Sequence, residues 1–139
     1  MSVIGMGASA MVANGLIALI EDDMSLAERV RRGMGSAFSL PVVAYRALSE
    51  LEQRLEGAPV QLVMLPLIDA TVKSVEACAG ALTVLSQLAP GVPVVILGFT
   101  NDVEAARTAI RHGAKGYLPC TKDFDLAVQA VRFILAGGT

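Results

Sequence analysis

Short apolar runs alternate with longer segments of helical period along most of this chain. The runs at 16–20, 60–65 and 93–98 are nearly continuous rather than alternating, and they are rich in valine, isoleucine and leucine. Continuous apolar runs are typical of strands that are covered on both faces, as in parallel sheets. Two further strands are expected at 40–45 and 115–119. The sequence therefore predicts five strands.

Helices are expected between these strands and after the last one, at 25–36, 46–56, 73–89, 102–112 and 123–136. Ser25 and Glu28 fit a capping box at the start of the first helix. Five βα units in a row need right-handed crossovers. We therefore predict an α/β fold, a doubly wound parallel five-stranded sheet with helices on both faces. Functional groups collect where the strands of such a sheet end.

The composition fits one domain and excludes several classes of protein. The chain has 139 residues, a formal net charge of −2 and no long basic run, so no surface for nucleic acid is indicated. The uncharged stretches 1–20 and 77–101 are interrupted by glycine, asparagine or proline, and neither predicts a signal peptide or a membrane span. Cys78 and Cys120 lack metal-ligand spacing, and they predict reduced thiols in a cytoplasmic protein.

The predicted strands end in residues of contrasting chemistry. Three carboxylates follow the first strand, whereas a proline, a glycine and a cysteine end the third, fourth and fifth: Glu21, Asp22 and Asp23 against Pro66, Gly98 and Cys120. Because the carboxyl ends of parallel strands meet at one edge of a sheet, we expect these groups to be neighbours.

The stretch 109–119 reads Ala-Ile-Arg-His-Gly-Ala-Lys-Gly-Tyr-Leu-Pro, and the helix after it closes with Ala-Gly-Gly. Together with the strand order and strand ends, this resembles the receiver domain of bacterial response regulators, the CheY-like, flavodoxin-like fold, over about 16–139. The stretch itself looks like the LuxR/NarL-type subgroup. In that subgroup a linker and a DNA-binding helix-turn-helix follow the receiver, and we expect them beyond the point where this sequence stops. The resemblance implies a role in two-component phosphorelay signal transduction and transcription regulation.

A receiver, as the family implies, accepts a phosphoryl group from a histidine kinase on an aspartate. This chemistry needs two acids that hold Mg²⁺ and a carboxylate nucleophile on the third strand. It also needs a hydroxyl on the fourth strand and a lysine on the fifth. By resemblance, Glu21 and Asp22 match the acidic pair. Pro66 takes the acceptor position, Gly98 the hydroxyl position and Cys120 the lysine position.

Three of the four functions are absent from this set. Proline has no nucleophile, glycine has no side chain, and a thiol with an ordinary pKa of ~8.5 is mostly neutral at pH 7. We therefore predict a degenerate phosphorylation pocket, no catalytic residue and no enzyme activity. No cofactor is expected, and Glu21 and Asp22 are only weak candidates for Mg²⁺. Asp69 is a possible substitute acceptor, although a loop or capping role is the simpler interpretation.

Several alternatives remain open at this stage. Tyr117 matches the family's switch aromatic, and its ring is either locked inward beside Gly98 or an ordinary half-buried strand tyrosine. Cys120 is an ordinary thiol or, if Lys122 lowers its pKa, a redox group. The vacated pocket is either without a ligand or the site of a small neutral metabolite, as in a ligand-sensing pseudoreceiver.

A glycine-rich segment near the start suggests a rival class of protein. Residues 5–10 read Gly-Met-Gly-Ala-Ser-Ala after Val3-Ile4, and they mimic an NAD(P)-binding fingerprint with Asp22 as the distant acid. The spacing argues against this, because too few residues separate the glycines from Glu21 for a crossover helix and a strand.

We divide the chain into two parts. Residues 1–15 are a flexible leader or a segment left over from the expression vector, and residues 16–139 are a receiver-like domain. The hypothesis for function is a phosphorylation-independent receiver that acts as a regulatory protein–protein interaction module. Its partner is a second copy or another signalling protein, with DNA bound only through a C-terminal output domain and no membrane contact. Two self-association surfaces are considered. One comprises the first and last helices, with Leu26, Val30, Val131 and Ile134, and the other comprises the fourth helix, the fifth strand and the last helix.

Overall fold

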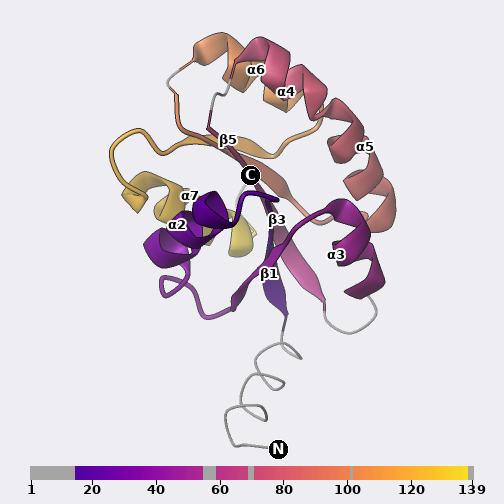
Figure 1. Cartoon of the computed structure of the whole chain (residues 1–139), viewed down its shortest axis with the longest axis vertical. Coiled ribbons are helices and arrows are strands. Elements are labelled where there is room, and N and C mark those ends of the chain that lie inside the picture. Colours follow the sequence, from indigo (N-terminus) through magenta and orange to yellow (C-terminus); the bar gives the residue numbers. More distant parts are fainter. Residues whose placement is uncertain (1–14, 55–58, 69–70, 101, 138–139) are drawn as a thin grey trace, which may run out of the picture.

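The fold is one parallel five-stranded sheet in the order β2-β1-β3-β4-β5 (Figure 1). The computed structural model describes residues 15–54, 59–68, 71–100 and 102–137. The strands are β1 (Leu16–Ile20), β2 (Val42–Tyr45), β3 (Val60–Leu67), β4 (Val94–Gly98) and β5 (Gly116–Pro119). All four strand pairs are parallel, which confirms the predicted fold class.

Helices cover both faces of this sheet. They are α2 (Met24–Met34), α3 (Leu48–Arg54), α4 (Val72–Ala77), α5 (Ala79–Leu88), α6 (Val103–Arg111) and α7 (Asp125–Leu135). α2 and α7 lie on one face, at the left of Figure 1, and α3, α4, α5 and α6 lie on the other. Within the described ranges, no helix is both long enough and apolar enough to cross a membrane.

The core consists of two hydrophobic clusters, one on each face of the sheet. In β1, Ile17 and Leu19 belong to the cluster under α2 and α7, whereas Leu16 and Ala18 belong to the cluster on the opposite face. β3 and β4 divide their side chains between the faces in the same way. Both faces of the central strands are therefore buried, and this explains why their sequences are apolar without alternation.

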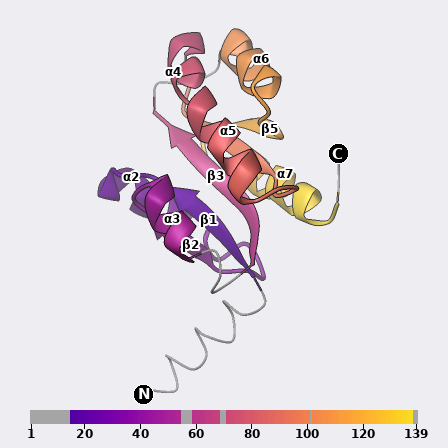
Figure 2. The same ribbon diagram turned by 90° about the vertical axis from the view of Figure 1, so that its right-hand side faces the viewer.

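The single helix expected at 73–89 is instead two helices, and that prediction is wrong. The helix is interrupted at Cys78, whose backbone N–H donates to the carbonyl of Val75 at 3.0 Å. Thr71 and Ser74 form a reciprocal capping box that starts α4 separately. Val75 is fully buried, and α4 packs against α6, next to it at the top of Figure 2. The interruption separates α4, which packs against α6, from α5, whose Leu82 and Leu85 pack in the core cluster on the sheet.

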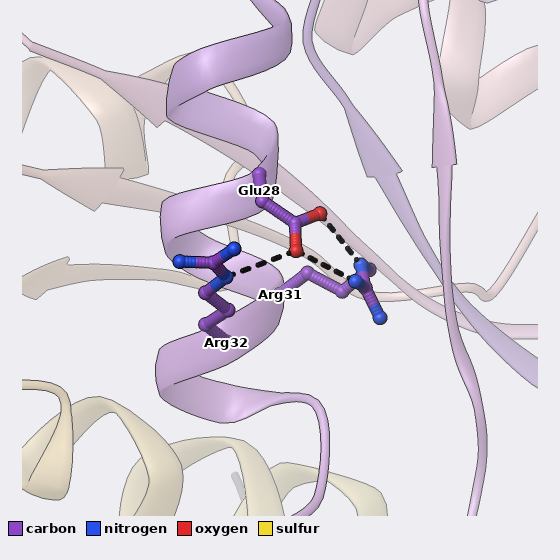
Figure 3. Close-up of polar contacts among 3 residues, drawn as sticks. All are labelled: Glu28, Arg31 and Arg32. Atoms are coloured by element: carbon purple, nitrogen blue, oxygen red, sulfur yellow. Dashed lines mark hydrogen bonds and ion pairs between the residues drawn. The ribbon is translucent and has the colours of Figure 1, made fainter.

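The capping box expected at Ser25 and Glu28 is also wrong. Asp23 caps α2, because its extended backbone lets its carboxylate accept from the N–H groups of Ser25 at 2.9 Å and Leu26 at 3.2 Å. Glu28 instead forms ion pairs with Arg31 at 2.7 Å and Arg32 at 3.1 Å on the exposed side of the helix (Figure 3).

The first predicted association surface is wrong at the level of its residues. Leu26, Val30 and Val131 are buried in the core cluster of α2 and α7, and Ile134 is partly buried against that cluster. The helical period identified an apolar side on each of these helices, but that side covers the sheet. The surface of α6, β5 and α7 stays a prediction.

Several sequence-based predictions fall on residues outside the described ranges. These are the leader up to residue 14, the glycine-rich segment 5–10 and the substitute acceptor Asp69. Gly15 is described, with φ +115°, a conformation that favours glycine directly before β1.

Candidate functional site

The acidic end of β1 is a tight turn in which two of the three carboxylates accept backbone hydrogen bonds. Glu21 Oε2 accepts from the N–H of Asp23 at 2.9 Å, and Asp23 caps α2. Burial raises the pKa of Glu21, although the bond from the Asp23 backbone opposes that shift. Asp22 and Asp23 are exposed. Asp23 therefore has a structural role in starting α2, and Glu21 bonds to the backbone of that capping residue.

The strand pairing places the predicted pocket residues at one edge of the sheet. Leu19 of β1 pairs with Met64 of β3, so Glu21 and Pro66 each lie two residues further along. Pro66 is buried and pairs with Leu97, the residue before Gly98.

The fifth strand joins the same edge. The backbone N–H of Cys120 donates to the carbonyl of Gly98 at 2.8 Å. Gly98 ends β4 and Cys120 directly follows β5, with the acids after β1 on the other side of β3. The prediction that the third strand stops at Pro66 is wrong, because β3 continues through Pro66 to Leu67, which pairs with Gly98.

The ring of Tyr117 occupies the space beside Gly98. A Cβ added to Gly98 would overlap the Oη and Cζ atoms of that ring. The Tyr117 hydroxyl donates to the carbonyl of Thr100 at 2.9 Å, and the half-buried ring packs against the core cluster that includes Val75. Burial raises the pKa of Tyr117. The ring thus lies inward, in the place where a side chain at position 98 would begin.

Cys120 is a buried and neutral thiol. It is 4% exposed, and burial raises its pKa to about 11, against a smaller lowering effect of Arg29. Its S–H contacts the carbonyl of Leu118 at 3.6 Å. Burial and the raised pKa favour the ordinary thiol over the redox alternative, in which Lys122 lowers this pKa.

An aromatic cluster next to Cys120 is missing from the sequence-based prediction. The Arg29 guanidinium lies 5.1 Å from the ring centroid of Phe99, and the Phe99 and Phe124 rings meet edge to face at 6.1 Å. Phe99 and Phe124 pack against the core cluster that contains Cys120. A Cβ at Gly33 would overlap the Phe124 ring. The cluster joins α2 to the segments that follow β4 and β5.

The one feature of the sequence that points to this cluster is the large aromatic residue Phe99 directly after Gly98. Its contact with Arg29 joins residues far apart in the chain, so spacing alone could not reveal it.

The described residues are a poor fit for a magnesium ion. No group of three or more histidine, cysteine, aspartate or glutamate side chains in the described ranges is arranged to hold a metal. Mg²⁺ prefers an octahedral set of oxygen ligands. The β1 acids supply carboxylates, but two of them already bind backbone N–H groups, and the Pro66 side chain supplies no oxygen.

This chain is similar to known proteins in its structure and not in its sequence. No protein-family model matches the sequence, and no curated protein matches it. A response regulator from Thermotoga maritima superposes with a TM-score of 0.71 at 15% identity, covering 88% of this chain and 98% of that one. A LuxR family DNA-binding response regulator from Silicibacter pomeroyi gives 0.65 at 26% identity, covering 88% and 93%.

A third solved structure of the same fold has a different description. It is a pilus assembly-related protein from Burkholderia pseudomallei, with a TM-score of 0.72 at 17% identity, covering 92% of this chain and 94% of that one. The chain therefore has the CheY-like receiver-domain fold of two-component response regulators.

Proposed function

We propose that this chain is a phosphorylation-independent receiver domain that acts as a regulatory protein–protein interaction module in the cytoplasm. The observation that carries the proposal is the apolar end of β3, β4 and β5. There Pro66 is buried at the acceptor position, and the Tyr117 ring fills the space beside Gly98. The receiver fold is retained while the groups for phosphoryl transfer are replaced.

Phosphoryl transfer to a protein needs a nucleophilic atom in line with the leaving group, and charge that stabilises the transferred oxygens. Pro66 has no such atom. Cys120 is neutral near pH 7 and buried, so it cannot balance phosphoryl charge as an ammonium would. The β1 acids alone would repel an incoming phosphate.

The surroundings of the site favour one fixed conformation. In a switching receiver, as the family resemblance implies, the aromatic residue of β5 moves between buried and exposed positions. Here the Tyr117 hydroxyl donates to the backbone carbonyl of Thr100. α4, whose Val75 is fully buried, packs against α6. We infer that the output depends on which protein binds this domain, and not on a modification that repositions Tyr117.

The proposed output is control of a DNA-binding domain beyond this sequence. Support comes from the 109–119 stretch and from the LuxR family DNA-binding regulator that shares the fold. The pilus assembly-related structure supports a second candidate, in which the domain contacts components of a protein assembly instead.

The two rival classes receive less support from the geometry. A ligand-sensing pseudoreceiver needs space among Asp22, Pro66, Gly98 and Cys120, but the Tyr117 ring takes the space at Gly98. The glycine-rich segment 5–10 of the dinucleotide-binding alternative lies outside the described residues, so the short spacing between these glycines and Glu21 remains the argument against it.

Fluorine NMR with beryllium fluoride and Mg²⁺ tests the proposal, because this mixture mimics a bound phosphoryl group. The receiver domain of DrrB, whose structure was solved in the BeF3-activated form, is the positive control. We expect a bound, Mg²⁺-dependent fluorine signal for the control and none for this chain. A saturable signal from the unmodified chain that disappears with Asp22→Asn would refute the proposal.

A further inference from the structure

α7 has an exposed apolar stripe on the side opposite the sheet. Leu126 is 69% exposed and Phe133 is 60% exposed. They are seven residues apart, which places them on the same side of the helix two turns from each other. Ala127 and Val131, on the other side, are 1% and 0% exposed. α7 therefore covers the sheet with one side and presents a second apolar side to solvent.

The residues of the stripe between Leu126 and Phe133 are uncharged. Gln129 lies on the stripe and is exposed, and the small Ala130 lies beside it. Neither carries charge. α6 also has two exposed apolar residues, Val103 and Ile110. Arg107 lies between those two and is exposed, so a second copy placed there would bring two guanidinium groups together.

Charges beside the α7 stripe identify the partner as a second copy in antiparallel orientation. Asp125 is in the first turn of the helix and Arg132 in the last. Each directly precedes a residue of the stripe, so both lie along the same flank. A twofold pairing that sets Leu126 against Phe133 of the second copy brings Asp125 toward Arg132 of that copy, twice. A parallel twofold pairing would instead place the two flanks on opposite sides of the contact, so these charges would not pair.

Arg132 is already held in position for this contact. Its Nε and one terminal nitrogen donate to the carbonyl of Ala37 at 3.1 and 2.7 Å. The other terminal nitrogen has no partner among the residues that the structure describes, so it can donate to a carboxylate of a second copy. A preoriented guanidinium loses less conformational freedom when it pairs.

We propose that this stripe, formed by Leu126, Gln129 and Phe133 with Asp125 and Arg132 on its flank, is a self-association surface that pairs two copies through antiparallel α7 helices. The inference rests on the proposed function, since it names the partner of the interaction module. A contact through one helix of 11 residues is smaller than the ~1,200 Å² of a stable interface, so we expect a weak dimer with a dissociation constant on the order of 100 μM.

Sedimentation equilibrium of the full chain from about 10 μM to about 1 mM measures this association. We expect the average mass to rise from the monomer value of 14.5 kDa toward twice that value. The variant Leu126→Ser/Phe133→Ser should stay monomeric, and circular dichroism checks that it is folded. The matched control Val103→Ser/Ile110→Ser removes two exposed apolar side chains from α6, which are 64% and 51% exposed, and should associate like the parent chain.

A charge variant tests the orientation. Asp125→Arg should weaken association at least about 10-fold more than Asp125→Asn, and added salt should reduce the difference, because the contact becomes a repulsion between exposed charges. A parent chain that stays monomeric at 1 mM, a stripe variant that associates normally, or an Asp125→Arg variant that behaves like the parent would each overturn the inference. The fluorine NMR result is independent of association, so failure here leaves the phosphorylation proposal standing.

Discussion

The carboxyl edge of the sheet has two parts with opposite character. After β1 the chain is acidic, with Asp22 and Asp23 exposed and Glu21 only partly covered. After β3, β4 and β5 the edge is apolar, with Pro66 and Gly98 buried and Cys120 only 4% exposed. A site that joins a metal ion to a phosphoryl group needs polar groups on both parts. Only one part has them here.

The two parts also differ in what their residues contribute to the fold. After β1, Glu21 and Asp23 accept backbone N–H groups, and Asp23 caps α2 and so stabilises the fold without a ligand. The β4 and β5 ends are stabilised by packing, in which the Tyr117 ring fills the space that Gly98 leaves. Retained acids are therefore weak evidence for a retained phosphorylation site, because Glu21, one of the matched pair, already accepts the backbone N–H of Asp23.

Restoring a hydroxyl at position 98 should have the largest effect on stability. Gly98 is not among the glycines with positive φ, so the cost of Gly98→Thr is steric. The new Cβ displaces the Tyr117 ring and breaks its hydrogen bond to Thr100. We expect the free energy of unfolding to fall by about 2–4 kcal/mol, from overpacking and one lost hydrogen bond. Urea denaturation measures it.

A glycine in an open position provides the control. Gly80 lies in α5, and a Cβ there meets nothing within 4 Å. Gly80→Ala should therefore stabilise the protein by about 0.5–1 kcal/mol. If Gly98→Thr is as harmless as Gly80→Ala, the Tyr117 ring does not fill this space in solution.

The buried thiol should be nearly unreactive. In a Cys78→Ser variant, Cys120 is the only thiol, and its pKa of about 11 leaves little thiolate. We expect alkylation in the native state to be at least about 100-fold slower than in the unfolded protein, because only the thiolate reacts and the sulfur is shielded. Timed alkylation with mass detection measures the two rates. Equal rates would show that the β5 end is open to solvent.

Removing only the Tyr117 hydroxyl should have a smaller effect. Tyr117→Phe keeps the ring beside Gly98 and deletes the bond to the Thr100 carbonyl at 2.9 Å. We expect a loss of about 1 kcal/mol, the usual net value of one hydrogen bond. Thermal unfolding compares the variant with the parent. An unchanged stability would show that this bond does not hold the ring inward.

Two glutamates on the polar side should show small pH effects of opposite sign. The pKa of Glu21 is raised from 4.5 by burial, so its ionisation opposes folding as pH rises through the folded-state pKa. Glu21→Gln should therefore gain stability relative to the parent between acidic and neutral pH. The bond from Arg31 lowers the pKa of Glu28, so Glu28 stabilises the fold above 4.5 and loses that effect as pH falls.

Glu28→Gln should accordingly lose stability relative to the parent near neutral pH, and the difference should vanish in acid. Thermal unfolding across this pH range measures both variants. Solvent screens both charges and keeps both effects on stability small, because Glu21 is only partly buried and Glu28 lies on the surface. Profiles of the same sign would contradict the assigned environments.

The strands could be predicted from the sequence more reliably than the contacts between helices. β1 has the predicted bounds, 16–20, because a continuous apolar run flanked by glycine and acids has few other interpretations. The break at Cys78 was not predicted, because Val75, Leu82 and Leu85 keep one helical period across it and Gly80, the only glycine in 73–89, lies beyond it.

Burial on the helices shows a similar limit. The helical spacing of apolar residues placed Val30 and Val131 on the apolar sides of their helices. Only the packing shows that these residues face the sheet while Leu126 and Phe133 face outward. At the site, strand ends placed Gly98 and Cys120 on neighbouring strands. The cluster of Arg29 with Phe99 required the tertiary structure, since nothing in local sequence links α2 to the segment after β4.

The intact mass of the chain after incubation with acetyl phosphate and Mg²⁺ tests the central claim most directly. The account predicts an unchanged mass, because Pro66 offers no acceptor atom opposite the acids of β1. A stable gain of one phosphoryl group, mapped by peptide analysis to a carboxylate at this edge of the sheet, would contradict it.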